Sequence, residues 1–365
     1  MSIIIFIIIL AVLVVSHEFG HYIAAKKSGI KVTEFGFGYP PRICKLFTKG
    51  ETEFTLNWLP FGGFVKIFGE DADDENTNGP ERDRSFVHKP ARIKAMVLVA
   101  GVFFNFILAW LLISIGFMSG LPTSTGAEPA GYTLNNTALV ITSVLPKSPA
   151  DIAKLKAGDK IISLAEGKDL LNNPNTDTLK SFITSHSEKE INILYTRAGV
   201  SESATVTPKA NLLSGTPGIG IGMDMIGTLK LPVHIAVWEG LKLTWDLTKH
   251  TAGSLWKLVH DAVVGHADLS GIAGPVGIVG IVGDAYHFGF IYLLSFTALI
   301  SINLAIINLL PFPALDGGRL LFLIIEKIKG SRINPKIANA INTIGFAILI
   351  IFMLIVTYHD IIKLI

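Results

Sequence analysis

Four stretches of this chain are long and apolar enough to cross a membrane, and they restrict the possible folds more than any other feature. They are residues 3–25, 95–117, 288–310 and 337–357. The hydrocarbon core of a bilayer is about 30 Å thick and takes roughly 20 apolar residues of helix to cross. The composition agrees, since 50% of the 365 residues are hydrophobic and only 16% are charged. The sequence therefore predicts a multi-pass α-helical membrane protein.

Basic residues are distributed unevenly around the four spans. The segment between the first two spans holds twelve Lys or Arg, and the short segment between the last two holds Arg319, Lys327, Lys329, Arg332 and Lys336. Cytoplasmic loops are enriched in Lys and Arg, so both segments are expected in the cytoplasm. Both termini and the long segment between the second and third spans are then expected outside. The first span has no basic head or cleavage site, so we expect it to be retained rather than cleaved as a leader.

Charge and cysteine content narrow the functional classes. The net charge is +2, and no basic run is interleaved with aromatic residues, so a nucleic-acid partner is not expected. Cys44 is the only cysteine, so no internal disulfide forms. We interpret it as a small buried hydrophobe or an inert free thiol.

The stretch HEFGH, residues 17–21, places ionisable side chains inside the first apolar span. His17 and His21 are four residues apart, so they share one face of a helix and both can reach one metal ion. In an H-E-x-x-H motif the glutamate, here Glu18, acts as a base towards water that the metal activates. Charged groups inside a bilayer helix cost about 2.5 kcal/mol or more, so such residues are expected to be functional.

Two histidines leave a catalytic zinc one ligand short, because such sites usually have three protein ligands and an open position. The candidate is Asp316 in NLLPFPALDGG, residues 308–318, at the inner end of the third span. The alternative is a turn in which this aspartate caps the next helix. The first and third spans run in the same direction across the membrane. Their inner ends therefore place Asp316 at the depth of HEFGH, which favours the ligand interpretation.

With these motifs in place, the chain resembles the site-2 proteases, intramembrane zinc metalloproteases, of the bacterial kind with a single PDZ domain. Further matches are EFGFGYPPRI from residue 34, PFGGFVKIFGE from residue 60, GVFFNFILA from residue 101 and GPVGI from residue 274. The resemblance implies that His17, His21 and Asp316 bind Zn²⁺, that Glu18 is the catalytic base, and that Asn308 holds the substrate backbone or the developing oxyanion.

Asn105 matches a recurring position of that family in the second span, although the proline that often stands beside the preceding glycine is replaced by Val102. Two interpretations of Asn105 remain open. It contacts substrate, or it makes a polar contact between helices, which is common in membranes.

Residues 51–69 of the cytoplasmic segment alternate apolar Phe54, Leu56 and Trp58 with polar residues, which predicts a β-strand, and Lys49 and Gly50 before them can turn a hairpin. A free strand edge binds an extended peptide by main-chain hydrogen bonds, so we expect these three residues to contact substrate. The resemblance implies that the hairpin dips into the membrane. An interfacial hairpin without substrate contact is the alternative. The acidic tract after it, residues 70–83, is interpreted as a solvated loop.

Outside the membrane, residues 130–212 look like a bacterial PDZ domain, with strand, helix and glycine-turn signals in order. Such domains filter substrates by size or bind a newly cut C-terminus, and the absence of a recognisable carboxylate-binding loop favours the filter. From residue 233 to 264, Trp238, Trp245 and Trp256 recur at near-helical spacing among polar residues. This pattern predicts an amphipathic helix on the outer leaflet. The histidines of this region, His234, His250, His260 and His266, are interpreted as interfacial.

The sequence thus predicts an intramembrane zinc endopeptidase of the bacterial cytoplasmic membrane that cuts single-span proteins, such as anti-sigma factors or remnant signal peptides, after a first ectodomain cut. The alternatives are a membrane metal transporter, since intramembrane His and Asp also mark ion paths, and an inactive PDZ scaffold. The expected order is the first span (1–27), the hairpin segment (28–94), the second span (95–120), the PDZ-like domain (121–228), the interfacial segment (229–285), the third span with the aspartate motif (286–318), a cytoplasmic loop (319–336), the fourth span (337–358) and a tail (359–365).

Overall fold

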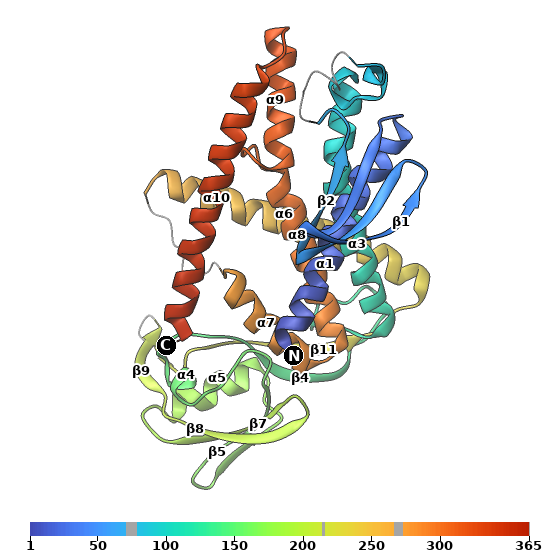
Figure 1. The fold of residues 1–365 in the computed structure, drawn as a ribbon. Coiled ribbons are helices and arrows are strands. Elements are labelled where there is room, and N and C mark those ends of the chain that lie inside the picture. The colour runs from blue at the N-terminus through green and yellow to red at the C-terminus, as the bar shows by residue number, and fades with distance from the viewer. Residues whose placement is uncertain (71–78, 214–215, 266–272, 365) are drawn as a thin grey trace. The chain divides into compact units, whose positions relative to one another are not determined.

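The computed structural model describes residues 1–70, 79–213, 216–265 and 273–364 (Figure 1). Most of the acidic tract, residues 71–78, and His266 lie outside the described residues. The chain divides into two compact units, which we call the helical unit and the β-rich unit. The helical unit comprises Met1–Ile113, Gly240–Asp284 and Ser295–Ile365, and the β-rich unit comprises Ser114–Glu239 and Ala285–Leu294.

Within the described residues, four helices are long and apolar enough to cross a membrane, which confirms the four predicted spans. They are α1 (Ser2–Lys27), α3 (Ala91–Ser119), α8 (Phe290–Leu309) and α10 (Pro335–Leu364). A shorter helix, α7 (Pro275–Phe288), precedes α8, and the two are separated by Gly289 at φ 111°. The third span therefore begins after this glycine, at Phe290.

A further helix, α9 (Asp316–Lys329), occupies much of the segment that the sequence analysis treats as a loop between the last two spans. It ends at Gly330, which adopts the left-handed conformation that glycine tolerates without strain. Asp316 is the first residue of this helix, and Leu315 precedes it as the N-cap. The capping interpretation of Asp316 is therefore wrong, because the carboxylate lies inside the helix and points to other partners.

Strands β1 (Val32–Lys49) and β2 (Thr52–Ile67) are joined by a tight turn in which Gly50 has φ 64°. Their register is folded back on itself: Glu34–Phe37 pairs with residues 63–66 on one side and with residues 53–56 on the other. Residues 53–56 pair in turn with residues 44–48. The segment that carries Phe54 and Leu56 is thus interior to the sheet, and residues 63–67 form an edge.

The side-chain pattern of the hairpin also differs from a simple alternation. Phe54 is buried in a cluster with Phe35, Val65 and residues of α1, whereas Leu56 is exposed. The polar residues beside them are the buried ones, because Thr55 donates to the Glu34 carboxylate at 2.7 Å and Asn57 donates to the Gly38 carbonyl at 3.2 Å. Cys44 is exposed on the hairpin, so it is a free thiol and not a buried hydrophobe.

The β-rich unit is built on an antiparallel sheet with the order β3-β11-β4-β5-β7-β8, to which β6 adds beside β5. Its core is formed by buried aliphatic residues of the sheet and of α5, including Leu139, Ile141, Leu164, Leu179 and Ile193. The elements are β3 (Leu121–Ser124), β4 (Asn135–Val144), α4 (Pro149–Ile152), β5 (Lys160–Glu166), β6 (Asp169–Asn172), α5 (Thr176–Ser185), β7 (Ile191–Arg197), β8 (Val200–Val206), β9 (Lys209–Leu213), β10 (Thr216–Gly218) and β11 (Ile221–Leu229).

The sheet extends beyond residues 130–212 on both sides, into strands β3 and β11 near the limits of the expected domain, residues 121–228. Strand β11 pairs with β4 on one side and with β3 on the other, so both are part of the same sheet. Helix α6 (Val233–Val263) follows, and three of its tryptophans are more than half exposed, Trp238, Trp245 and Trp256. This exposure agrees with an amphipathic helix, and its position on a membrane surface stays a prediction. His234, His250 and His260 all lie on this helix.

Candidate metal centre

The side chains of His17, His21 and Asp316 meet inside the helical unit. His17 and His21 project from the same face of α1, one turn apart, and Asp316 comes from the start of α9. Their approaching atoms are close together: 3.0 Å between His17 Nε2 and Asp316 Oδ2, 3.3 Å between His21 Nε2 and Asp316 Oδ2, and 3.1 Å between the two Nε2 atoms. Both histidines are only 7% exposed, so the cluster is largely removed from solvent.

These three atoms fit one tetrahedral metal ion. Zinc binds histidine nitrogen and carboxylate oxygen at about 2.0–2.2 Å, which places the ligand atoms of a tetrahedron about 3.3 Å apart. In addition, His21 Nδ1–H donates to the carbonyl oxygen of Val97 at 2.8 Å, which leaves Nε2 as the unprotonated nitrogen that a metal requires. Two histidines and one carboxylate form a site with an open fourth position, as catalytic zinc sites have.

Glycines allow the helices around this centre to approach closely. A Cβ on Gly101 of α3 would lie 2.4 Å from His21 Nε2, and a Cβ on Gly20 of α1 would lie 2.3 Å from the Ala100 carbonyl oxygen. At the other side of the centre, Gly317 and Gly318 lie against backbone carbonyl groups of the preceding turn, where a Cβ would come within 2.3 Å. Larger residues at these positions would displace the elements that carry the metal-binding side chains.

A cavity of about 480 Å³ opens beside the metal centre. Glu18 and Asn308 both line it, together with the three candidate ligands, so the structure brings five of the predicted site residues together. Gly63 and Val65, on the edge strand of the hairpin, line the cavity with Glu18, and a Cβ on Gly63 would lie 3.7 Å from Glu18 Cγ. The edge strand is thus placed directly beside the predicted base.

Asn105 is fully buried behind the metal centre and faces His17 rather than the cavity. Its Nδ2 lies 3.3 Å from His17 Nδ1, and its Oδ1 has no hydrogen-bond partner among the described residues. Ser301 of α8 donates to the Asn105 backbone carbonyl at 2.8 Å. The position therefore agrees with a contact between helices, and it adds a contact with a metal-binding histidine that sequence analysis does not predict.

The hairpin residues predicted to contact substrate are not at the cavity. Phe54 is buried in the hairpin core, and Leu56 and Trp58 are exposed and are not among the described residues that line the cavity. The residues that line it from this side are Gly63, Phe64, Val65 and Ile67. In the sequence, only the motif PFGGFVKIFGE marks these residues. The alternation of apolar and polar residues predicts a strand, but it does not indicate which part of the strand forms the edge of the sheet.

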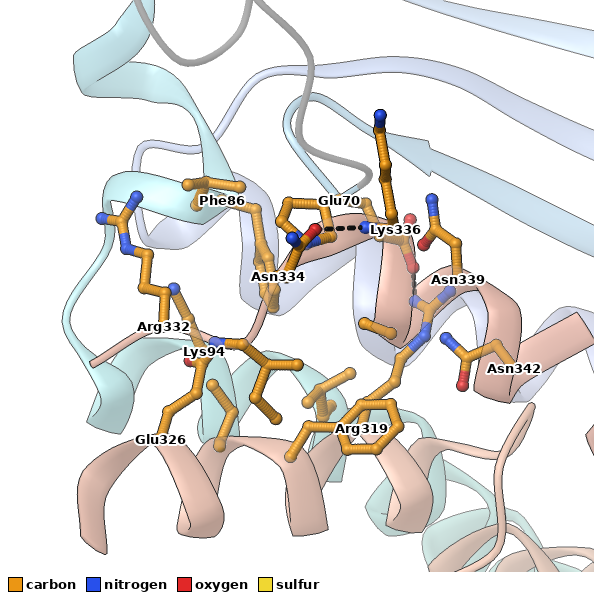
Figure 2. Close-up of a pocket in the computed structure, with 17 residues that line it drawn as sticks. Glu70, Phe86, Lys94, Arg319, Glu326, Arg332, Asn334, Lys336, Asn339 and Asn342 are labelled. Carbon is orange, nitrogen blue, oxygen red and sulfur yellow. Dashed lines mark hydrogen bonds and ion pairs between the residues drawn. The ribbon is translucent and has the colours of Figure 1, made fainter. Parts of the chain in front are cut away.

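Arg319 and Glu70 also line the metal cavity and were not predicted as site residues. They form an ion pair, which Figure 2 shows beside a second cavity in the helical unit. Arg319 lies one helical turn after Asp316 on α9, so the pair joins the aspartate-bearing helix to the end of the hairpin segment.

Comparison with known proteins gives similarity along the whole chain. A model of the family described as peptidase family M50 matches residues 5–352. The zinc metalloprotease RasP of Geobacillus kaustophilus is 30% identical, over 99% of this chain and 98% of the relative. A putative zinc metalloprotease of Clostridium perfringens is 33% identical, over 99% of both chains. The regulator of sigma-W protease RasP of Bacillus subtilis is 31% identical, over 100% of this chain and 99% of the relative.

A solved structure resembles part of the chain. The PDZ domain of an SdrC-like protein from Listeria monocytogenes is 25% identical and covers 25% of this chain and 92% of that domain, with a TM-score of 0.21.

Proposed function

Because the chain belongs to peptidase family M50, and is thus a zinc metalloprotease, we propose that it cuts single-span membrane proteins within their membrane segments. The observation that carries this proposal is the position of the His17, His21 and Asp316 cluster on helices that are long enough to span a membrane or adjoin such a helix. A relative is named for regulation of sigma-W, which supports anti-sigma factors as one substrate class. Remnant signal peptides are a second class.

His17, His21 and Asp316 would hold the zinc ion, which acts as a Lewis acid and lowers the pKa of a bound water. Glu18 accepts the proton of the attacking water and passes it to the amine that leaves when the peptide bond breaks. The edge strand beside Glu18, at Gly63 and Val65, limits the positions that its carboxylate can take for this transfer. Asn308, on the wall of the same cavity, donates its amide hydrogens to the substrate carbonyl or the oxyanion that develops from it.

An extended peptide is the form of substrate that this site accepts. A helix has its peptide groups hydrogen-bonded internally, so the scissile region must unwind before water reaches it. Residues 63–67 present a strand edge beside Glu18, and pairing with that edge would replace the lost helical hydrogen bonds. We therefore assign peptide binding to this edge and not to Phe54, Leu56 and Trp58.

The topology that follows from the positive-inside rule places the metal centre near the cytoplasmic side and the PDZ-like domain outside. In that arrangement the PDZ-like domain restricts access to proteins whose ectodomain a first protease has already removed.

Transport of metal ions is supported less well by the described residues. A transporter needs further ligands along a route through the membrane. The one other cluster of potential ligands in the described part of the chain, Glu166, Asp169 and His186, belongs to the β-rich unit and not to a span. An inactive scaffold would have no need of Glu18 beside the metal centre.

The proposal is tested with purified full-length protein and a panel of tagged single-span substrates. Glu18→Gln should retain one zinc per chain and lose cleavage, because the base is not a ligand. His17→Ala and Asp316→Asn should lose both the zinc and the cleavage. Cleavage by Glu18→Gln near the parental rate would rule out its role as the base. Full zinc content in Asp316→Asn would reassign the third ligand.

A further inference from the structure

A second cavity of about 550 Å³ lies in the helical unit between α3, α9 and the start of α10, and Figure 2 shows the residues that line it. Its surface is divided by chemistry. One part is apolar, with Phe86, Leu98, Phe322, Leu323 and Ile333, and the other is polar, with Lys94, Arg319, Glu326, Arg332, Asn334, Lys336, Asn339 and Asn342 among its members. An amphiphilic ligand would match both parts.

The acidic and basic side chains of the cavity differ in the contacts that they make within the protein. The two carboxylates are engaged within the protein: Glu70 pairs with Arg319, and Glu326 Oε1 accepts the backbone N–H of Ile333 at 2.9 Å. Lys94, Arg332 and Lys336 have no ion pair with a described residue. Lys94 instead lies over the ring of Phe86, with Nζ 5.8 Å from its centroid. Glu326 keeps its charge near Lys94, but the four basic side chains of the cavity outnumber its two carboxylates, and the net positive charge favours an anionic ligand.

The cavity also lies where two spans begin. Helix α3 starts at Ala91 and α10 at Pro335, so Lys94 and Lys336 belong to the first turns, where the helix dipole adds positive potential. The first residues of a membrane-spanning helix lie at the depth of lipid headgroups. The cavity is thus at the level at which phosphate groups of the bilayer are available.

Helix α10 supplies an apolar surface that continues from the cavity. One face of the helix, which holds Val356 and Asp360, is buried, and the other faces are open, with Ile344, Phe346, Ile351 and Leu354 each more than half exposed. In a membrane these side chains contact acyl chains. A molecule with a phosphate in the cavity and hydrocarbon chains along α10 would satisfy both surfaces.

We propose that this cavity binds the headgroup of an anionic phospholipid, with the phosphate held by Lys94 and Arg332 and the acyl chains lying against α10. A peptide is a poorer match, because the cytoplasmic flanks of single-span proteins are rich in Lys and Arg and would be repelled by the same cations. This assignment depends on membrane insertion of the chain and not on its proteolytic activity.

The test measures lipid binding by the full-length protein in neutral detergent, by native mass spectrometry with added phosphatidylglycerol or phosphatidylcholine. The parent should retain phosphatidylglycerol preferentially. Lys94→Gln combined with Arg332→Gln should weaken that binding by at least about 10-fold, since each basic residue near lipid phosphate contributes about 1 kcal/mol. The charge-conserving pair Lys94→Arg and Arg332→Lys should keep it.

A matched control removes the same charge elsewhere. Lys27 and Lys49 are exposed and do not line the cavity, so Lys27→Gln with Lys49→Gln should bind phosphatidylglycerol as the parent does. Zinc content of each variant shows whether the helical unit is folded. Should the glutamine pair at Lys94 and Arg332 misfold, Lys336→Gln at the rim provides a milder version of the same loss.

Three outcomes would overturn the assignment. Equal loss of lipid in the control pair would show that only net charge matters. Displacement of the lipid by inorganic phosphate at matched concentration would show a site for small anions. Unchanged lipid binding with slower cleavage of a substrate in the Lys94 and Arg332 variant would show that the cavity holds peptide.

Discussion

The carbonyl oxygen of Asn105, directly behind a predicted metal ligand, has no hydrogen-bond partner among the described residues, and a half-turn of the amide would give it one. In the turned position Oδ1 faces His17 Nδ1, whose N–H then donates to it across the same 3.3 Å. That hydrogen bond fixes the proton on Nδ1 and leaves Nε2 for the metal, as the Val97 carbonyl does for His21. Asn105 would then act as a positioning residue for His17 and have no contact with substrate.

We expect Asn105→Leu to weaken zinc binding about 10–100-fold, because outer-shell partners of metal ligands have effects of this size. Asn105→Asp keeps an acceptor opposite Nδ1 and should retain affinity close to that of the parent. Competition with a chelator measures the affinity without reference to catalysis. Equal zinc affinity of Asn105→Leu and the parent would show that Asn105 only makes a contact between helices.

Gly101 gives a second test at the residue scale. Gly101→Ala would place a Cβ 2.4 Å from His21 Nε2, so we expect loss of zinc and a lower melting temperature. Gly253→Ala is the control, because Gly253 is also inside a helix and has open space around its Cβ position. It should be neutral or stabilising by about 1 kcal/mol, since glycine is unfavourable in a helix. A parental zinc content in Gly101→Ala would mean that the two helices separate without cost.

The sequence predicts which side chains meet in the cluster better than it predicts the residues that support them. His17 and His21 are linked by helical spacing. Asp316 is linked to them because it follows the inner end of the third span, which runs in the same direction as the first. The contact of Asn105 with His17 depends on the packing of α1 against α3, which the glycines at the crossing permit but do not specify. Neither residue's own neighbourhood in the sequence indicates this partner.

Among the elements, the edge strand of residues 63–67 has the most direct effect on Glu18. Val65→Pro removes a backbone N–H of the strand that lies beside Glu18, and proline is tolerated on strand edges. We expect cleavage to fall at least about 10-fold while zinc content is unchanged, since general-base catalysis contributes about 10²–10⁴-fold. Val65→Ala retains the N–H and should cleave near the parental rate. A similar loss in both variants would point to packing and not to this N–H.

The period-two pattern of the hairpin predicts a strand correctly, but it does not indicate which residues of the strand lie at the cavity. Alternation indicates that neighbouring residues face opposite ways, but it does not say which face is buried when polar side chains find partners inside. Thr55 and Asn57 have such partners, and so they take the buried positions. The fold-back of the register, which makes residues 63–67 the edge, has no local signal at all.

His186, at the end of α5 in the β-rich unit, couples that unit to pH. Its pKa is raised above its ordinary value, first because Nδ1–H donates to the Phe182 carbonyl and then because Asp169 accepts from Nε2. Because the pKa of His186 is higher in the folded than in the unfolded chain, protonation stabilises the folded state at pH values below the unfolded pKa of about 6.5. This stabilisation is lost as pH rises through the folded pKa. Asp169→Asn removes one cause of the raised pKa, so the free energy of unfolding should fall less as pH rises through that range.

Amide hydrogen exchange in β5 and β7 of the full-length chain, corrected for the intrinsic effect of pH on exchange, measures this stability. Lys168→Gln, in the adjacent turn, changes charge without removing a partner of His186 and serves as the control. Identical pH profiles for the parent and Asp169→Asn would exclude the coupling.

For the whole molecule, hydropathy predicts the four spans, but the strand signals of the inserted domain do not indicate how its outer strands pair. Residues 130–212 contain the obvious strand and turn signals, but β3 and β11 flank them and complete the sheet. Strand β11 pairs with β4 across about 80 residues of intervening chain, a contact that no short window of sequence contains. A deletion of residues 130–212 alone would remove β4 and leave β11 paired only with β3. Misfolding of such a variant would be confused with loss of function.

The structure defines a cleaner deletion. The Leu231 N–H donates to the Phe117 carbonyl at 2.9 Å, so the chain enters and leaves the PDZ-like domain at adjacent points. Residues 121–229 can therefore be replaced by a short Gly/Ser bridge without stretching the ends. The predicted zinc ligands all belong to the helical unit, and zinc content should be unchanged.

If the PDZ-like domain filters by size, this deletion should leave cleavage of a trimmed single-span substrate near the parental rate. An intact substrate with a folded ectodomain, which the parent refuses, should now be cut, because the steric barrier is gone. If the domain instead delivers substrate by binding its new C-terminus, the trimmed form should be cut more slowly and the intact form not at all. Cleavage of both forms, followed in membranes with Glu18→Gln as the inactive reference, distinguishes the two. We expect the first result; slower cleavage of the trimmed form by a variant that retains its zinc would exclude the filter.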